Sequence, residues 1–563
     1  MNEKQFTISE VIDSFGITKH SWVLFIILSL AQVLDGYDFM IINSTNLFVA
    51  HTFWPNDPNP GALMGSLTTW GLLGMVIGGA IGGILSDRIG RKKMLIIAVM
   101  FYGFFTLPQA FSNDLAFFAA FRLIAGLGVG SCIPIVTTVF AETMPSKHRG
   151  LFIACGQACM VGGWVVAGLV ANPICNAEVP LLGDFTNAVT YIATTATGET
   201  VEQTMYANWR LCYLIGGIPL VYGIVLFFLM KETPHWYANA GRFDDAVKVL
   251  ADIERVSLGT ETKRDPSCLV IPPRPKKTTP SVLFSNKYII GTCAIWSLYF
   301  VGQFCVYGMN AWLPAWFSGI GYSPSEAVSL QTWNNFAAII SNSAAGFISD
   351  RVGRKRNLLG AWVLCAAVIV ICSIFVAPNQ FLFCIGLMLL FGFSLNYAIT
   401  SVNLLMPEQY PTAIRNTGVA WCQAFARFGG SASSIVLGGI AGMAAFQTVG
   451  GTTNWSLVVL VLIVPFVLGF ICALLFVRDT NGKSMDQLAN EATGDELSGT
   501  APFAIMLAIV VILFSLCIVC PLAISGWSKL PIALPLMATG MLLPFAFFFI
   551  FGGKQLAKDA GRK

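Results

Sequence analysis

A few charged residues lie inside long apolar segments of this 563-residue chain, where an unpaired charge is costly. Asp35 and Asp38 belong to Asp35-Gly36-Tyr37-Asp38 and share one face of a helix. Asp35 follows Trp22 by thirteen residues, about 20 Å at ~1.5 Å per residue, which is near the middle of a bilayer. Burial beside a like charge favours protonation of at least one carboxyl. We therefore predict proton carriers here; the alternative is structural pairing with a buried arginine.

Two arginines also lie inside apolar segments, Arg122 and Arg427. Arg427 is about ten residues, ~15 Å, from the inner end of its segment. A planar guanidinium there would hold a carboxylate or a phosphate by two parallel hydrogen bonds. Alternatively, Arg427 neutralises Asp35 or Asp38.

Polar residues in neighbouring apolar segments would complete a substrate site around Arg427. Each of them could instead be a hydrogen-bonding contact between helices. The predicted substrate-binding residues are Arg427, Gln303, Tyr307, Asn310, Trp333, Asn334, Asn396, Tyr397, Gln423 and Gln157.

The segments that must position these side chains are membrane-spanning helices. Apolar residues make up 55% of the chain and charged residues only 11%, which excludes a soluble globule. Fourteen apolar runs are each long enough to cross the ~30 Å hydrocarbon core as a helix. The runs are continuous rather than alternating, which excludes a β-barrel. The fold class is therefore an all-α polytopic membrane protein.

The distribution of Lys and Arg predicts the orientation of these helices. All but four of the 33 basic residues lie at the N-terminus, in alternate loops or in the C-terminal tail. The loops at 49–62, 175–208, 318–326 and 447–454 contain none. By the positive-inside rule, both termini and the basic loops are cytoplasmic, and the protein is a multi-pass protein of the plasma (cell inner) membrane. The net charge of +4 thus reflects topology and indicates no nucleic-acid partner.

Two loop motifs occur twice in the same order, which indicates a duplicated bundle. Residues 85–93 (Leu-Ser-Asp-Arg-Ile-Gly-Arg-Lys-Lys) return almost unchanged at 348–356, and Glu-x-x-Pro-x-x-x-Arg occurs at 142–149 and 408–415. Together these motifs resemble the major facilitator superfamily over about residues 1–477. The resemblance implies loops that latch one conformation. We interpret Glu142/Arg149 and Glu408/Arg415 as charge pairs between the halves that break and reform. A topology anchor and static pairs are the simpler alternatives. The implied gating residues are Asp87, Arg88, Arg91, Glu142, Arg149, Asp350, Arg351, Arg354, Glu408 and Arg415.

The resemblance also implies the organisation of the chain. We expect two pseudo-symmetric six-helix halves, 1–230 and 288–477, joined by a cytoplasmic linker at 231–287 in which Asp244 to Arg255 has a helical period. A second linker, 478–500, leads to two additional helices and a tail within 501–563, giving fourteen transmembrane helices in total. The extra pair is expected to be a packing or partner surface.

Asp35-Gly36-Tyr37-Asp38 with the inner-loop motifs is most similar to the aromatic acid:proton symporters and the neighbouring sialate and monocarboxylate symporters. This similarity implies that Asp35, Asp38 and Arg122 take part in proton coupling and that Arg427 contacts an anion. The expected function is symport of a small organic anion, an aromatic or aliphatic carboxylate, by alternating access. The proton gradient supplies the energy without a cofactor, and a monomer in the lipid bilayer suffices.

Two other functions remain open from the sequence. A carrier of a neutral or cationic solute would use the aspartates to bind the solute directly. A non-transporting nutrient sensor would signal through the linkers and the extra helices, although no effector is recognisable in the linkers. An enzyme is not indicated, because the sequence has no nucleophile–base pair and no metal-ligating cluster.

Overall fold

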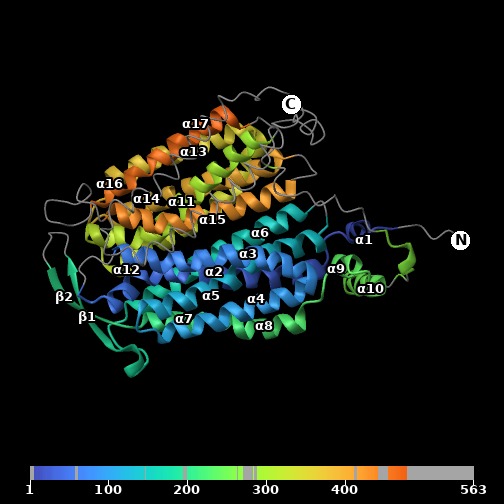
Figure 1. Cartoon of the computed structure of the whole chain (residues 1–563), viewed down its shortest axis with the longest axis horizontal. Helices are drawn as coiled ribbons and strands as arrows, with labels where there is room; N and C mark the ends of the chain where they lie inside the picture. Colours follow the sequence, from blue (N-terminus) through green and yellow to red (C-terminus); the bar gives the residue numbers. More distant parts are fainter. Residues whose placement is uncertain are drawn as a thin grey trace, which may run out of the picture. The chain divides into compact units, whose positions relative to one another are not determined.

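The computed structural model describes residues 6–56, 61–145, 148–194, 200–260, 262, 264–270, 283, 288–410, 415–441 and 454–477. The two expected C-terminal helices and the linker at 478–500 lie outside this part of the chain, as does the Pro-rich part of the first linker. The described chain is almost entirely helical (Figure 1).

The first six predicted runs are helical. They correspond to α2 (Lys19–Phe53), α3 (Gly61–Ile89), α4 (Arg91–Thr106), α5 (Leu115–Thr143), α6 (Arg149–Cys175) and the pair α7 (Trp209–Ile215) and α8 (Ile218–Leu229). Asp114 caps α5, because its carboxylate accepts from the backbone N–H of Phe117. Gly90, at φ +111°, breaks the chain between α3 and α4, a conformation that a residue with a Cβ rarely adopts.

The next six runs are helical as well. They form α11 (Ile289–Ile320), α12 (Pro324–Val352), α13 (Arg354–Phe375), α14 (Phe381–Leu405), α15 (Arg415–Ala441) and the pair α16 (Trp455–Val461) and α17 (Ile463–Phe476). Ser323 and Glu326 form a capping box at the start of α12. Gly353, at φ +96°, repeats the role of Gly90 between α12 and α13.

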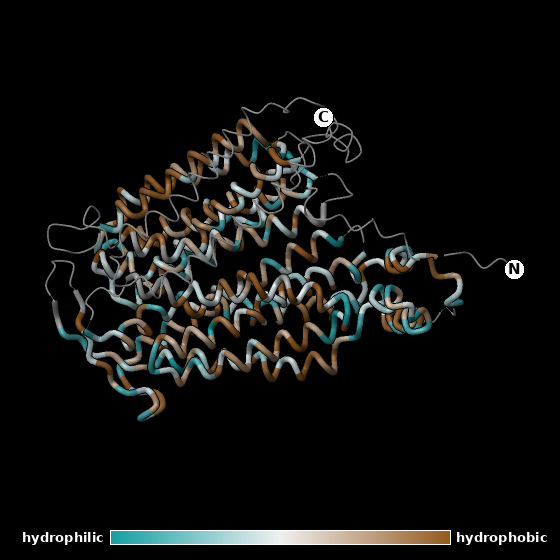
Figure 2. The backbone as a smooth tube through the Cα atoms, in the orientation of Figure 1, coloured by the Kyte–Doolittle hydropathy of each residue, from teal (hydrophilic) through white to brown (hydrophobic). Residues whose placement is uncertain are grey.

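Ten spans in the described residues are long and apolar enough to cross a membrane. Helices α12 and α15 are not among the ten; both carry polar residues such as Gln331, Asn334, Gln423 and Arg427. Figure 2 shows apolar residues along the lengths of the helices and hydrophilic residues near their ends.

Three elements were not expected from the sequence. A short N-terminal helix, α1 (Ile8–Phe15), starts at a capping box made by Thr7 and Glu10. Strands β1 (Ala188–Thr194) and β2 (Thr200–Tyr206) form an antiparallel hairpin in the predicted outer loop. The prediction of a purely α-helical chain was therefore wrong for this loop, whose β-branched residues favour strands.

The linker folds into a small helical cap with α1. Helix α10 (Phe243–Leu258) confirms the helical period predicted for Asp244 to Arg255, and the short helix α9 (Pro234–Asn239) precedes it. An apolar cluster joins these parts, and its buried members are Ile8, Val11, Ile12, Ala238, Ala246, Leu250 and Leu269. Burial of these apolar side chains stabilises the packing of α1 against the linker, and we call the two together the cap.

The helices gather into two compact units. The first contains the described residues of 6–42, 74–170 and 209–270, and the second contains those of 43–73, 171–208 and 288–477. The ends of α2 and α3 next to the loop at 54–60, and the end of α6 next to the β hairpin, therefore belong to the second unit. The predicted boundary between the sequence repeats runs differently, since it keeps all of 1–230 together.

Candidate functional site

The acidic motif of α2 is buried inside the first unit. Asp35 and Asp38 are each only 1% exposed. Gly36 lets α2 and α6 touch backbone to backbone, since a Cβ at this position would overlap the carbonyl of Met160. Tyr37 donates from its hydroxyl to the carbonyl of Cys212, 2.8 Å away. Gly36 and Tyr37 thus hold α2 in place, and this fixes the positions of the Asp35 and Asp38 carboxylates.

Asp38 forms a buried ion pair with Arg122 of α5. Arg122 Nη1 donates to Asp38 Oδ2 at 3.1 Å, and Nη2 donates to the backbone carbonyls of Asp38 and Phe39 at 2.6 and 3.3 Å. Arg122 is 3% exposed. The backbone contacts hold the guanidinium against α2 whatever the charge of the carboxylate. The buried arginine that the sequence offered as an alternative partner is therefore present, and it is Arg122.

Thr106 at the end of α4 completes the surroundings of Asp38. Its hydroxyl donates to Asp38 Oδ1 at 2.6 Å. A proton on Oδ1 requires this hydroxyl to turn and accept, whereas a proton on Oδ2 removes an acceptor from Arg122. Sequence inspection missed Thr106, because one threonine at a helix end gives no signal without the fold.

Asp35 lies one turn before Asp38 in a different environment. Cys132 of α5 lies within electrostatic range of its carboxylate, and Tyr102 of α4 lies within range of both Asp35 and Asp38; both residues are fully buried. Neither residue is a cation, so a charge at Asp35 gains little from them. The first unit therefore presents two carboxylates with unlike surroundings on a single helix face.

Four of the predicted substrate residues of α11, α12 and α14 form hydrogen bonds with other helices or within their own helix. Asn334 donates to the side-chain oxygen of Asn310 at 3.5 Å, and the Tyr397 hydroxyl donates to Asn357 Oδ1 at 2.5 Å. Asn396 donates to the carbonyl of Gly392 at 2.9 Å. These contacts are the interhelical and intrahelical bonds that the alternative interpretation expects.

Other predicted substrate residues keep accessible surface. Trp333 is 41% exposed, Gln423 is exposed, and Arg427 is half-buried. Gln303 and Tyr307 are at the edge of burial on α11, at 8% and 9% exposure, and Gln157 of α6 is half-buried in the first unit.

Tyr299 of α11 interacts electrostatically with Arg427. Its hydroxyl is hydrogen-bonded to Asn403 and is within electrostatic range of both Arg427 and Tyr307. Residue 299 belongs to the stretch that the repeat places opposite Asp35, where the sequence has no acid. In the second unit, a tyrosine thus occupies the stretch that carries the carboxylates in the first unit.

Both inner-loop motifs form an ion pair of the same design. Arg91 donates through Nε and Nη2 to Glu142 at 3.2 and 3.0 Å, and Arg354 donates through Nε to Glu408 at 2.9 Å. Arg91 also pairs with Asp87 at 2.8 Å. Arg88 and Arg351 are exposed and Arg149 is half-buried, while the side chains of Asp350 and Arg415 lie outside the described part of the structure.

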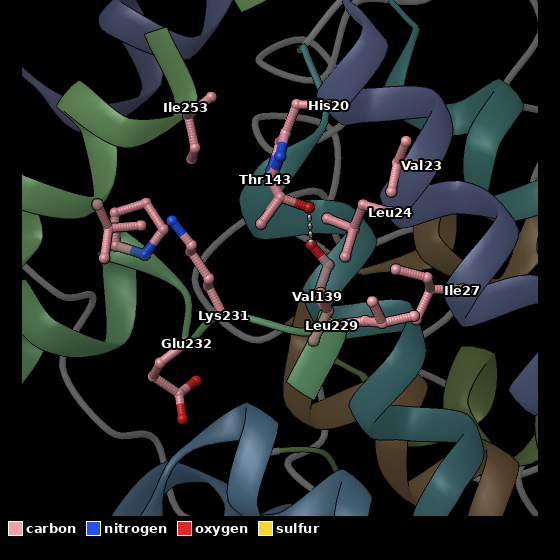
Figure 3. A pocket seen from close by; sticks show the side chains of 12 residues that line it. His20, Val23, Leu24, Ile27, Val139, Thr143, Leu229, Lys231, Glu232 and Ile253 are labelled. Carbon is pink, nitrogen blue, oxygen red and sulfur yellow. Dashed lines mark hydrogen bonds between the residues drawn. The ribbon is translucent and has the colours of Figure 1, made fainter. Parts of the chain in front are cut away.

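A pocket near the inner loops of the first unit contains none of the predicted substrate residues. Figure 3 shows it between the start of α2, the end of α5 and α10. Its walls are apolar apart from His20, Thr143, Lys231 and Glu232. The Glu232 carboxylate already accepts hydrogen bonds from the backbone N–H groups of Arg91 and Lys92 at the start of α4. This pocket is part of the cap and is not a candidate transport site.

Long apolar helices, duplicated inner-loop pairs and buried intramembrane charges define a polytopic membrane carrier. A family model described as "Major Facilitator Superfamily" matches residues 28–434 of the chain. The chain therefore belongs to the major facilitator superfamily.

Similar proteins of known role are transporters of organic acids. The chain is 29% identical to a niacin transporter of Acinetobacter baylyi, over 76% of this chain and 88% of that protein. It is 28% identical to a 4-hydroxybenzoate transporter of Pseudomonas aeruginosa, over 76% and 87% respectively. It is 26% identical to a gallate transporter of Pseudomonas putida, over 77% and 88%. These relatives match the aromatic acid:proton symporter group and identify the chain as a transporter rather than an enzyme.

Solved structures support the fold. An inward-open xylose transporter from E. coli aligns with a TM-score of 0.60 at 19% identity, covering 83% of this chain and 99% of that one.

Proposed function

We propose that this protein is a proton-coupled symporter of a small organic anion, an aromatic or aliphatic carboxylate. The observation that carries the proposal is the buried Asp38–Arg122 pair with Asp35 one turn away on the same helix. The named acid transporters among the relatives support a carboxylate substrate.

In the proposed cycle, protons from outside reach Asp35 and Asp38. Protonation of Asp38 removes the charged partner of Arg122, which stays in place on the carbonyls of Asp38 and Phe39. The site then carries one more positive charge, which favours binding of an anion. Release of the anion and the proton on the inner side restores the ion pair. Each transport step is thus tied to one change of charge at Asp38.

Arg427 is the proposed anion contact. The residue is half-buried rather than fully enclosed, and Tyr299 lies within electrostatic range of it. Gln423, one turn earlier on α15, is exposed and can add a hydrogen bond to the substrate. Symport of a proton with the anion offsets the membrane potential, which opposes anion entry by ~2.3 kcal/mol per charge per 100 mV.

The finer organisation of the chain belongs to the same proposal. We place fourteen transmembrane helices in the plasma (cell inner) membrane, with both termini cytoplasmic, and treat residues 1–230 and 288–477 as the transport halves. The energy source is the proton gradient and the working unit is a monomer.

Uptake into proteoliposomes tests this function. Purified protein is reconstituted and given labelled 4-hydroxybenzoate or niacin with and without an inward proton gradient. Accumulation that requires the gradient supports symport, and its loss in Asp35→Asn and Asp38→Asn assigns the coupling. Uptake that ignores the gradient would contradict the coupling, and competition by organic cations but not by organic acids would favour the rival cation carrier.

A further inference from the structure

Helix α11 carries a proline in its interior, Pro314. Proline has no backbone N–H, so the carbonyl four residues earlier, that of Asn310, loses its helical donor. Asn310 is 2% exposed and the next residue, Ala311, is 1% exposed. A buried carbonyl without a donor is costly, so a donor from elsewhere is required at this position.

Side chains from two other helices donate to this part of α11. Gln331 of α12 donates through Nε2 to the carbonyl of Asn310 at 2.5 Å. Asn46 of α2 donates through Nδ2 to the carbonyl of Ala311 at 2.6 Å. The hydroxyl of Ser44 in α2 donates to the free oxygen of the Gln331 amide at 3.3 Å, which links the two donors. Asn46, Gln331 and Ser44 are each 1% exposed.

Further neutral contacts within the second unit join the ends of α3 and α6 to α15 and α12. The Thr69 hydroxyl of α3 donates to the carbonyl of Ser431 in α15 at 3.2 Å. Asn172 of α6 donates to the Ser329 hydroxyl of α12 at 2.9 Å. All these contacts lie at the end of the helices that is connected by the loops without Lys or Arg. The positive-inside rule assigns this end to the outside.

We propose that Asn46 and Gln331 clamp the α11 backbone at Pro314 and thereby hold the outward end of the carrier closed. They are positioning residues for alternating access and do not contact the substrate. Pro314 keeps the Asn310 carbonyl free of a helical partner, so the same carbonyl can exchange a side-chain donor for water each time the end opens. The clamp is therefore reversible without rebuilding α11.

The clamp is made of amides, a hydroxyl and backbone carbonyls, and none of these groups titrates near neutral pH. Its strength is therefore independent of pH, and pH sensitivity of transport has to arise elsewhere. The proposal requires only that the chain is a transporter. It stands whether or not the carrier is coupled to protons.

A cysteine reporter measures opening of this end. Thr69→Cys is introduced as the common background, and its reaction with a membrane-impermeant maleimide added from outside is followed in cells, after subtraction of the labelling of the native chain. Asn46→Ala and Gln331→Ala should each raise the rate by roughly five- to tenfold, as expected for the loss of one buried hydrogen bond. The matched control is Thr332→Val, since Thr332 lies beside Gln331 but donates only to Val328 within α12.

A double-mutant cycle separates the clamp from a general loosening of the protein. Pro314→Ala restores an N–H that can donate to Asn310, so Gln331→Ala should change the rate less than twofold in that background. An equal effect in both backgrounds would overturn the link between Gln331 and the proline. If the Gln331 variants do not accumulate, Asn46→Ala decides alone: an unchanged rate overturns the clamp.

Discussion

The inner loops of the two units are built alike, whereas their interiors are not. Arg91 binds Glu142 in the first unit, and Arg354 binds Glu408 in the second, each from the start of a helix that follows a left-handed glycine. In the interiors, α2 and α5 contribute Asp35, Asp38 and Arg122, while α11 and α14 contain no acidic or basic residue at all.

The difference distinguishes residues that serve the common fold from residues that serve one repeat only. A feature that occurs in both repeats serves the fold that the repeats share. A costly buried charge kept in a single repeat serves something that only one repeat does. We therefore propose that coupling depends on the Asp38–Arg122 pair, whereas the repeated inner pairs belong to the fold that both repeats share.

The largest expected effect is that of removing the unrepeated charge. Asp38→Asn leaves Arg122 buried beside a neutral amide, so we expect gradient-driven accumulation to be lost and the free energy of unfolding to fall by about 3–5 kcal/mol. Uptake assays and thermal unfolding in detergent measure the two quantities. Asp245→Asn, which affects a partly exposed pair with Arg242 on α10, is the control and should change neither by much. Normal accumulation by Asp38→Asn would remove the distinction between the repeats.

The two inner pairs offer a comparison of smaller effects. Both arginines also donate to a serine at the end of the preceding helix, Arg91 to the Ser86 carbonyl and Arg354 to the Ser349 hydroxyl. The Arg91 side chain is 8% exposed, however, whereas that of Arg354 is 25% exposed. We expect Arg91→Ala to lower the free energy of unfolding by about 3 kcal/mol and Arg354→Ala by about 1 kcal/mol. Denaturant unfolding of both variants measures this ratio, and equal losses would show that burial does not set the cost.

The close approach of α2 and α6 can be tested with two neighbouring glycine positions. Gly36→Ala places a methyl group against the carbonyl of Met160, and we expect a loss of about 1–3 kcal/mol together with impaired transport. Gly162→Ala meets no atom within 4 Å and should be neutral or slightly stabilising. A stable and active Gly36→Ala variant would show that the motif tolerates a wider helix separation.

The cap of the first unit gives the smallest predicted effect, and it depends on pH. Burial raises the pKa of Glu254, but hydrogen bonds from Thr262 and Arg264 and the charge of Arg264 outweigh it, so the net pKa lies below the usual 4.5. The lowered pKa stabilises the cap at pH values above 4.5, and this contribution is lost as the pH falls through the lower value of the folded state.

Glu254→Gln should therefore destabilise the cap at pH 7 but not at a pH well below the folded pKa. Hydrogen exchange of α10 at the two pH values measures the difference. An equal change in hydrogen exchange at the two pH values would show that the charge of Glu254 does not stabilise the cap.

The sequence predicted the positions of the first twelve helical runs and the buried charges, because length, apolarity and charge are local signals. The partner of Asp38 could not be chosen from sequence. Arg122 and Arg427 are both cations inside helices, and only the packing of α5 against α2 decides for Arg122. Thr106 was missed for the same reason.

Other differences have identifiable physical causes. Asn310 and Asn334 look like substrate contacts in a sequence, since both are polar residues at the depth of a site, but the fold turns them toward each other. The β hairpin was not predicted, because the charge of its loop indicates only the side of the membrane, whereas the strands depend on its β-branched residues. The role of Gln331 depends on Pro314 in another helix, and such a pairing has no pattern along the chain.

Proton movement on addition of substrate tests the central claim most directly. Proteoliposomes without any imposed gradient receive an aromatic acid, and the external pH is recorded in a weak buffer. We expect the medium to become alkaline with the native protein, and we expect Asp35→Asn and Asp38→Asn to abolish this change while exchange of labelled substrate continues. An equal alkaline shift in the variants, or none with a native protein that takes up the acid, would contradict this claim.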